Sequence, residues 1–271
     1  MPIFLSGLLL LYLGLFPGSI MAPSEEWQIL WKVQAKGTDM YADNLGNPFV
    51  VNGDELIKLR DDGQLFRRYS NKTLGHISSV DVSNPLKILV FYKDFSRIVF
   101  LDNTLSENGT AINLDERDLE QTSLVCTSYD NGFWLFEPVH FRLIRFNQHL
   151  QESVRVLNLN QVLNGPLQPI ALCENENRLF MNDPQRGIIL FDVFGTYVKT
   201  IPLKGVRKFQ VTGDIIIYAD QDEFLKIFNL KTLQQTRIEL PIQMYADWQF
   251  EIERLYMLAN DSLTAFKAPG F

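Results

Sequence analysis

The stretch Tyr41–Tyr69, YADNLGNPFVVNGDELIKLRDDGQLFRRY, decides the fold. Three turn signals (Asn-Leu-Gly-Asn, Asn-Gly-Asp and Asp-Asp-Gly) divide it into four short segments with the composition of β-strands. Gly and Asn in these turns supply the positive φ angles that tight hairpins need. Pro48 stands at the start of the apolar run Phe49–Val51, where its missing N–H group is tolerated. The stretch therefore predicts an antiparallel sheet of four strands.

This unit recurs along the chain. The third predicted strand has equivalent runs at Leu56–Leu59, Ile98–Leu101, Leu143–Phe146, Ile188–Phe191, Leu225–Phe228 and Leu263–Phe266. The second predicted strand has equivalent runs at Phe49–Val51, Ile88–Phe91, Phe133–Phe136, Arg178–Met181, Ile215–Tyr218 and Leu255–Leu258. Repeats of roughly 40 residues with four strands each are typical of propeller blades. Helical repeats of this length would space apolar residues three and four apart, which these runs do not. We expect an all-β protein, a six-bladed β-propeller of four-stranded antiparallel blades.

The two ends of the chain predict how the ring closes. Too few residues follow Phe266 to give the sixth blade a fourth strand. The N-terminal segment Trp27–Gln34 has no other place in the repeat, and its apolar residues Trp27, Ile29, Trp31 and Val33 alternate with polar ones. We expect it to pair with the last blade, with all four apolar side chains facing inward. Closure of this kind removes an exposed sheet edge.

The repeats resemble a known superfamily. Residues 42–51 (ADNLGNPFVV), 56–69 (LIKLRDDGQLFRRY) and 187–201 (GIILFDVFGTYVKTI) are similar to blades of the six-bladed propellers of the NHL and TolB-like kind. The resemblance covers nearly all of the chain after about residue 25. It implies the fold but no single activity, because the superfamily includes lactonases, lyases, sugar-acid hydrolases and binding scaffolds.

The first 22 residues predict a signal peptide. Residues 1–24 contain no charged side chain, and the apolar stretch Ile3–Phe16 is shorter than the ~20 residues that span a membrane. Ser19 and Ala22 are small residues suited to cleavage, and an uncleaved N-terminal anchor is the alternative. We expect an exported protein, periplasmic or extracellular, whose residues 23–271 form one propeller domain.

Composition narrows the possible partners. The net charge is −7, and no stripe of basic residues could neutralise the phosphates of a nucleic acid. Cys126 and Cys173 fall on the predicted first strands of neighbouring blades, where we expect small buried free thiols. A disulfide between them stays open as an alternative in an oxidising compartment.

No catalytic motif emerges from the sequence. His76, His140 and His149 lie in predicted turns rather than on first strands, and we expect them at the surface. The resemblance implies that hydrolases of the superfamily hold calcium on the axis with oxygen ligands from the first strands. The candidates for that channel are Asp39, Asp43, Asp81, Glu174, Asn175, Asp247 and Gln249. Two blades offer only weak ligands, so we expect these residues to line a hydrated channel without a metal or a cofactor.

Two long connections between blades predict a partner-binding surface. Asn113–Glu120 is acidic and Asn158–Asn164 is rich in amides, and each has the pattern of a short helical turn with an Asn or Asp cap. Both join a fourth strand to the next first strand, so both belong to one face of the disc. The candidate partner-binding residues are Asp115, Glu116, Asp118, Glu120, Asn160 and Asn164. The alternative is a lid over the blade junctions.

The hypothesis favoured by the sequence is a non-catalytic exported scaffold, or accessory subunit of a cell-envelope complex, that binds a protein partner through one propeller face. Contact with a membrane would come only from an uncleaved N-terminal segment. The alternatives are an exported hydrolase or lyase, or a binder of a small ligand, acting at the central channel.

Overall fold

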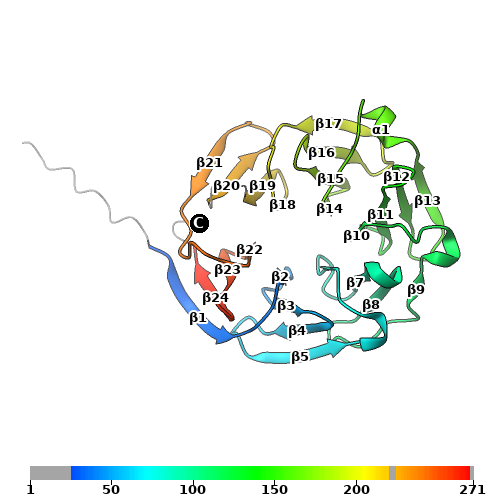
Figure 1. The fold of residues 1–271 in the computed structure, drawn as a ribbon. Helices are drawn as coiled ribbons and strands as arrows, with labels where there is room; N and C mark the ends of the chain where they lie inside the picture. Colours follow the sequence, from blue (N-terminus) through cyan, green and yellow to red (C-terminus); the bar gives the residue numbers. More distant parts are fainter. Residues whose placement is uncertain (1–25, 220–223, 269–271) are drawn as a thin grey trace, which may run out of the picture.

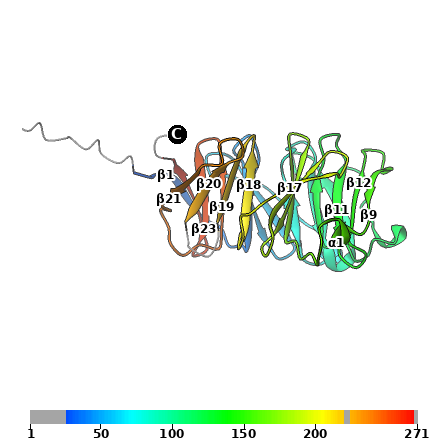
Figure 2. The same cartoon turned by 90° about the horizontal axis from the view of Figure 1, so that it is seen from above.

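The computed structural model describes residues 26–219 and 224–268. These residues form a ring of six sheets around a central axis (Figure 1). Each sheet has four antiparallel strands, as the repeat predicts. Seen from the edge, the ring is a flat disc (Figure 2). The predicted signal peptide, residues 1–22, lies outside the described residues. None of the helices described is long and apolar enough to cross a membrane.

The strands take equivalent places in every blade, from the axis outward. The innermost strands are β2 (Asp39–Ala42), β6 (Ser79–Asp81), β10 (Leu124–Thr127), β14 (Ala171–Asn175), β18 (Lys208–Thr212) and β22 (Asp247–Glu251). The second strands are β3 (Pro48–Asn52), β7 (Ile88–Tyr92), β11 (Phe133–Glu137), β15 (Arg178–Asp183), β19 (Ile215–Ala219) and β23 (Arg254–Ala259). The third strands are β4 (Glu55–Leu59), β8 (Arg97–Leu101), β12 (Arg142–Phe146), β16 (Gly187–Asp192), β20 (Leu225–Asn229) and β24 (Ser262–Lys267). The outermost are β5 (Leu65–Ser70), β9 (Ile112–Asn113), β13 (Glu152–Val156), β17 (Tyr197–Ile201), β21 (Gln235–Ile238) and β1 (Gln28–Gln34).

Short helical turns occur between the strands. They are η1 (Lys72–Leu74), η2 (Lys93–Phe95), η3 (Asp115–Arg117) and α1 (Leu159–Val162).

The apolar core is divided among the junctions between blades. The second strands are buried on both faces, as in β7 and β11, where every residue is buried. This explains why they read as continuous apolar runs rather than alternating ones. Six apolar clusters result, one between each pair of neighbouring blades. Blade 1 therefore contributes to two clusters, one shared with blade 2 and the other with blade 6.

An Asp or Asn at the end of the third strand, or directly after it, fixes the outer hairpin of several blades. The Oδ1 atom of Asp102 accepts hydrogen bonds from the backbone N–H groups of Thr104 and Ser106. Asn147 and Asp192 make the same pair of bonds two and four residues ahead. An Asx side chain that bonds its own turn in this way stabilises a reversal of the chain. The repeated Asp or Asn is therefore a turn-forming residue rather than a ligand.

The N-terminal strand closes the ring, as predicted. β1 pairs antiparallel with β24 of blade 6. The Nε1 group of Trp27 donates to the carbonyl of Glu239 in blade 5, at 2.9 Å, and that of Trp31 donates to the carbonyl of Asp61 in blade 1, at 2.8 Å. The closing strand therefore fastens blade 6 to both of its neighbours.

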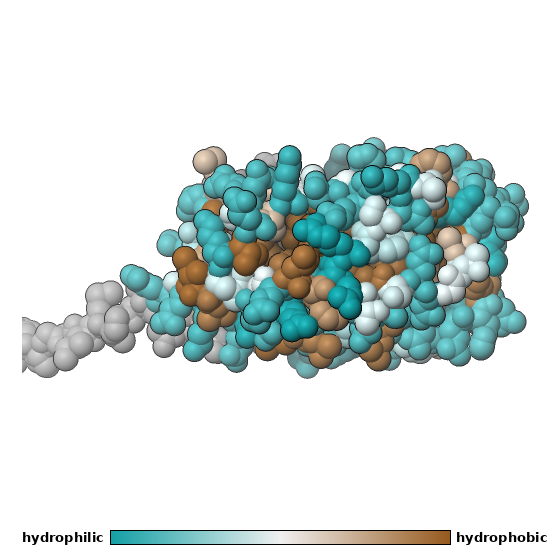
Figure 3. Space-filling view, turned by 90° about the horizontal axis from the view of Figure 1, so that it is seen from below, coloured by the Kyte–Doolittle hydropathy of each residue, from teal (hydrophilic) through white to brown (hydrophobic). Residues whose placement is uncertain are grey.

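One part of the closure prediction was wrong. Ile29 was expected to face inward but is 63 % exposed, because a β-bulge between Ile29 and Trp31 interrupts the alternation. Leu30 is exposed as well. The rim of the disc carries scattered apolar patches on a mostly hydrophilic surface (Figure 3).

Both cysteines are free, as predicted, but only Cys126 is buried, whereas Cys173 is half-buried. Cys126 is buried in the apolar cluster between blades 3 and 4, whereas Cys173 packs against the cluster between blades 4 and 5. The two side chains therefore face different junctions, and burial raises the pKa of the Cys126 thiol well above its ordinary value.

Candidate functional site: the connector face and its pocket

Polar side chains of the innermost strands bond from blade to blade. Asp81 accepts from the backbone N–H and the hydroxyl of Thr127 at 2.8 and 2.9 Å, which links blades 2 and 3. Glu174 accepts from the Ser128 hydroxyl at 2.7 Å and from Trp134 Nε1 at 2.6 Å, which links blades 4 and 3. These two carboxylates are held by protein donors, as buried or half-buried carboxylates need to be.

The same pattern continues around the ring. Asn175 Oδ1 accepts from the Gly213 N–H at 3.1 Å between blades 4 and 5, and Gln210 Oε1 accepts from the Phe250 N–H at 3.1 Å between blades 5 and 6. The hydroxyl of Tyr41 bonds the backbone of Val80 between blades 1 and 2. Burial is the main cause that raises the pKa of Tyr41, with nearby carboxylates adding to it.

Asp247 completes this inner ring between blades 6 and 1. Its Oδ2 atom accepts from the Met40 N–H at 2.8 Å, and both of its oxygens lie 2.7 Å from Lys208 Nζ of blade 5. Lys208 also donates to the Met40 carbonyl at 3.1 Å. This ion pair therefore joins three blades, and every junction of the ring carries at least one bond from an inner side chain.

The other predicted channel residues have different surroundings. Asp43 is fully buried, accepts from the N–H groups of Leu45 and Asn47, and lies 3.8 Å from Lys58 Nζ. It therefore stabilises a turn and does not line the channel, a correction that follows from its place just beyond the end of β2. Asp39 is exposed at the start of β2, and Gln249 is half-buried in the middle of β22.

Within the described residues, no group of three or more His, Cys, Asp or Glu side chains is placed to hold a metal ion. His76, His140 and His149 are all exposed and lie outside the strands, where the sequence placed them. The inner ring can thus hold blades together, and its polar groups are largely committed to that role.

The face at which the innermost strands begin carries all connections between blades, and we call it the connector face. The acidic connection lies here, between β9 and β10, and contains η3. Asp115 forms an ion pair with Arg97 at 3.0 Å, and the hydrogen bond from Arg97 lowers its pKa. The remaining acids Glu116, Asp118 and Glu120 are exposed. The N-cap residue of η3 is Leu114, so the predicted Asn or Asp cap is absent from that position. Asn113, one residue earlier, instead accepts a hydrogen bond from the Asp115 N–H through its Oδ1 atom.

The amide-rich connection lies between β13 and β14 and contains α1, which Figure 2 shows on one face of the disc. Asn158 occupies the N-cap position but adopts a left-handed backbone (φ 53°) and makes no capping bond with its side chain, contrary to expectation. The Asn160 carbonyl accepts from the Gly165 N–H, and the exposed Asn164 has a φ of 55°. Backbone bonds rather than a side-chain cap shape this turn.

The hairpin between β11 and β12 lies between these two connections. Arg142 at the start of β12 donates to the Asp118 carbonyl at 2.8 Å on one side. On the other side, the Leu159 N–H donates to the Phe141 carbonyl at 3.1 Å. Arg142 also bonds the buried Glu137 at 2.7 Å. The acidic turn, this hairpin and the amide-rich turn therefore form one connected surface.

Exposed apolar side chains belong to the same surface, and no sequence pattern distinguishes them from apolar residues of the core. They are Phe95 (50 % exposed), Val139 (59 %), Leu157 (51 %), Val162 (50 %) and Ile170 (47 %). We call the acidic turn, the hairpin, the amide-rich turn and these five side chains the blade 2–4 patch. The patch thus contains both apolar and charged or amide side chains, a mixture common in surfaces that bind proteins.

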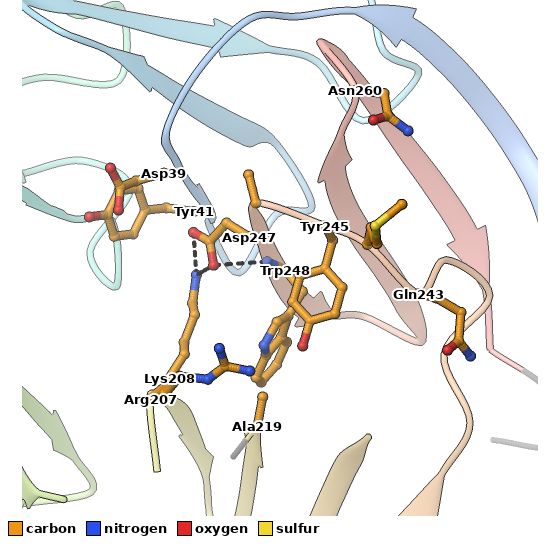
Figure 4. Close-up of a pocket in the computed structure, with 12 residues that line it drawn as sticks. Asp39, Tyr41, Arg207, Lys208, Ala219, Gln243, Tyr245, Asp247, Trp248 and Asn260 are labelled. Atoms are coloured by element: carbon orange, nitrogen blue, oxygen red, sulfur yellow. Dashed lines mark hydrogen bonds and ion pairs between the residues drawn. The ribbon is translucent and has the colours of Figure 1, made fainter. Parts of the chain in front are cut away.

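A pocket of about 660 Å³ opens on the same face over blades 5, 6 and 1. Its lining includes Asp39, Tyr41, Arg207, Lys208, Tyr245 and Asp247. Figure 4 shows the Lys208–Asp247 pair near its centre, with Trp248 and Tyr245 beside it. The pocket and the blade 2–4 patch thus occupy different sectors of one face.

Comparisons with known proteins show the fold alone. No protein-family model matches the chain, and no curated protein matches it in sequence. Among solved structures, the Pan2 WD40 domain of Neurospora crassa has a TM-score of 0.66 at 9 % identity, over 93 % of this chain and 98 % of that one. Virginiamycin B lyase from Staphylococcus aureus has a TM-score of 0.62 at 11 % identity, over 89 % and 99 % of the two chains. A catalytically inactive variant of this lyase, in which alanine replaces a histidine, gives 0.64 at 10 % identity, over the same shares.

Proposed function

We propose that this propeller is a non-catalytic protein-interaction scaffold of the cell envelope, and that it binds its partner through the blade 2–4 patch. The observation that carries the proposal is the arrangement of two shaped connections around one hairpin, with half-exposed apolar side chains among acidic and amide groups. Loops held on a rigid scaffold are where recognition residues are usually found. Export and a place among the NHL and TolB-like propellers are parts of the same proposal.

The state of the inner carboxylates supports a non-catalytic role. Asp81, Glu174 and Asp247 each accept several hydrogen bonds from a neighbouring blade, so they are engaged in holding the ring. A general acid or base needs a titratable group free to reach a substrate. The structurally similar lyase loses activity when a histidine is replaced, whereas all three histidines of this chain are exposed outside its strands.

The charge of the patch indicates the chemistry of the partner. Glu116, Asp118 and Glu120 are exposed acids, and Val139 is an exposed apolar residue of the same patch. A partner with basic and apolar residues would complement both features. Complementary charge speeds association and makes it depend on salt, and a specific contact buries roughly 800 Å² on each side.

The test reverses charge at exposed acids for which no ion pair is described, and it removes one exposed side-chain bond, from Asn113 to Glu116 at 2.8 Å. Asp115 is unsuitable because it pairs with Arg97, and Asp118 is unsuitable because its backbone is left-handed (φ 55°). We therefore choose the double variant Glu116→Lys/Glu120→Lys. The matched control, Glu26→Lys/Asp62→Lys, makes the same change of charge at exposed positions on the opposite face, and it too removes one exposed bond, from the Gln64 N–H to Asp62.

Immobilised parent and variant proteins are incubated with extract of the native source over a range of salt, and retained proteins are quantified by mass spectrometry. We expect the Glu116/Glu120 variant to lose proteins that the parent and the control retain, most strongly at low salt, with an unchanged melting temperature. Equal retention by all three proteins would place the docking site elsewhere.

Catalysis at the central channel is the competing function, and calcium tests it. If the inner carboxylates only hold the blades, EDTA should leave the melting temperature unchanged. A metal at a hundredfold excess over its Kd would add about 2.7 kcal/mol to the free energy of unfolding. A calcium-dependent rise in melting temperature would favour the hydrolase or lyase and make Asp81 and Glu174 the first residues to mutate.

A further inference from the structure

The outermost strand of blade 2 differs from its counterparts. β9 (Ile112–Asn113) has two residues, whereas the outermost strands of the other blades have four to seven. A single bridge joins Leu101 at the end of β8 to Glu107, and regular pairing with β8 resumes only at β9. Residues 108–111 lie between these two pairings and belong to no strand. A loop therefore takes the place of most of a strand at the outer edge of this blade (Figure 1).

This loop contains an asparagine followed by a glycine. Asn108, Gly109 and Thr110 are all exposed, and a Cβ atom added to Gly109 would meet no other atom within 4 Å. The Asn108 N–H donates to the Phe100 carbonyl at 2.7 Å. Within the part of the chain that the structure describes, the Gly109 N–H and the Asn108 carboxamide have no hydrogen-bond partner. Exposed backbone with so few contacts changes conformation at little cost in free energy.

Three other asparagines of the chain also precede a glycine, and the fold holds each of these pairs. They are Asn52–Gly53, Asn131–Gly132 and Asn164–Gly165. The N–H groups of Gly132 and Gly165 donate to oxygen acceptors at 3.0 and 2.7 Å. Gly53 lies in the tight turn between β3 and β4, where its carbonyl accepts from the Ile77 N–H at 2.9 Å. Gly132 is buried and the other two are half-buried, so the exposed Gly109 is the least constrained of the four.

An asparagine beside a mobile glycine can modify itself. The glycine backbone nitrogen, once it loses its proton, attacks the carbonyl carbon of the asparagine carboxamide. A C–N bond forms, ammonia leaves, and the two residues share a cyclic imide, the succinimide. Water then adds to one of the two imide carbonyls and breaks its bond to nitrogen, which gives aspartate or isoaspartate. The backbone must rotate to bring the nitrogen to the side chain, which glycine permits most readily.

We propose that Asn108 is a site of spontaneous covalent modification, where its side chain and the Gly109 nitrogen form a succinimide that opens to isoaspartate and aspartate. Either product replaces a neutral amide with a carboxylate, on a chain whose net charge is already −7. Isoaspartate also inserts one side-chain carbon into the backbone. The new carboxylate arises next to Glu107, which accepts from the Tyr69 hydroxyl of blade 1 at 2.8 Å. The change therefore falls beside a contact between blades 1 and 2.

Ageing of the purified protein in heavy-oxygen water tests this assignment. The protein is incubated at 37 °C and pH 8, once folded and once in guanidinium chloride, and is then digested with trypsin. A conversion during the incubation incorporates one heavy oxygen atom, so mass spectrometry distinguishes it from a conversion during digestion. The four Asn-Gly pairs fall on separate tryptic peptides, residues 37–58, 98–117, 118–142 and 156–178. Electron-transfer fragmentation separates isoaspartate from aspartate.

In the folded protein, we expect Asn108 to convert at least ~tenfold faster than each of the other three asparagines. This ratio is equivalent to a difference of 1.4 kcal/mol in the cost of local opening. In guanidinium chloride the contacts that hold the other pairs are lost, so the four rates should approach one another. Asn108→Gln should abolish the labelled product of peptide 98–117. The matched control, Asn103→Gln, changes an exposed asparagine of the same peptide and should leave that product unchanged.

Three outcomes would overturn the assignment. Asn108 could persist in the folded protein, or another Asn-Gly pair could convert equally fast. Its advantage could also be the same in guanidinium chloride, which would trace it to the local sequence instead of the fold. The inference does not depend on the proposed partner, because the residues involved are different. Partner capture by the Glu116→Lys/Glu120→Lys protein reports on another surface, so the two proposals can fail separately.

Discussion

Removal of the Asp247 carboxylate should destabilise the ring more than the loss of any exposed charge. In Asp247→Ala, the Lys208 ammonium loses its counter-ion and the buried Met40 N–H loses its acceptor. Breaking a fully buried pair from one side costs about 3–5 kcal/mol. The side chains here are 11 % and 25 % exposed, so water can partly replace the lost partner and we expect about 3 kcal/mol.

The opposite truncation should cost less. In Lys208→Met, Asp247 keeps the N–H groups of Met40 and Trp248 as donors, and the apolar stem of the lysine is largely replaced. We expect a loss of about 1–2 kcal/mol, typical of a charged hydrogen bond. Because the residues share one network, the double variant should lose at least ~1 kcal/mol less than the two single variants together.

Urea denaturation at pH 7 with linear extrapolation measures these differences. The matched control is Asp39→Ala, which removes an exposed carboxylate from the same pocket and should cost less than about 0.5 kcal/mol. If Asp247→Ala were no more costly than Asp39→Ala, or if the two single changes were additive, the pair would not be a structural link among three blades.

Three further outcomes are expected. Trp31→Ala removes the hydrogen bond to the Asp61 carbonyl and the contacts of a half-buried ring, so it should lower the free energy of unfolding by about 2 kcal/mol in urea titrations. A free energy of unfolding equal to the parent's would refute the role of β1 in closure. Gly63→Ala should cost at least ~1 kcal/mol by the same assay, since φ is +83° and the new Cβ would lie 2.8 Å from the Trp31 ring; an unchanged stability would contradict this close approach. Burial, and to a smaller extent the charge of Asp43, raises the pKa of Glu251 to about 7, compared with ~4.3 in the unfolded chain. The folded state therefore favours the protonated carboxyl, so the free energy of unfolding should fall as the pH rises from about 4 to 7 and stay low at higher pH. Glu251→Gln should therefore raise the melting temperature at pH 8 by a few degrees, about 1 kcal/mol after screening of this partly exposed group, but hardly at pH 4; equal shifts at both pH values would refute the assignment.

The fold could be predicted because its determinants are local and repeated. Turn residues such as the Asn-Gly of the first blade and the Asp or Asn after third strands act within a few residues of themselves. The second strands are buried on both faces, so each of them is a continuous apolar run that can be recognised in the sequence of a single blade. The exposure of Ile29 could not be predicted, because the bulge depends on how β1 meets β24.

The site was harder to predict because its partners come from different blades. Asp81 and Glu174 are recognisable in the sequence as polar residues of first strands. The donors that they bind, Thr127 and Ser128, lie 46 residues away in the sequence. Gln210 and Tyr41 were not chosen as site residues, although their position on first strands was the available signal. The pocket combines residues from Asp39 to Asn260, which no local pattern connects.

The closing strand has a consequence for the order in which the protein folds. Among the strands that the structure describes, β1 is the first and its hydrogen-bonding partner β24 is the last, with Gln28 opposite Lys267. During synthesis on the ribosome, blades 1 to 5 can each complete four strands as they emerge, whereas blade 6 must wait for β24. Closing so long a loop adds an entropic cost, and such non-local pairing is slow. A circular permutant that places β1 directly after β24 would make blade 6 local, and the last step of folding would become an ordinary hairpin.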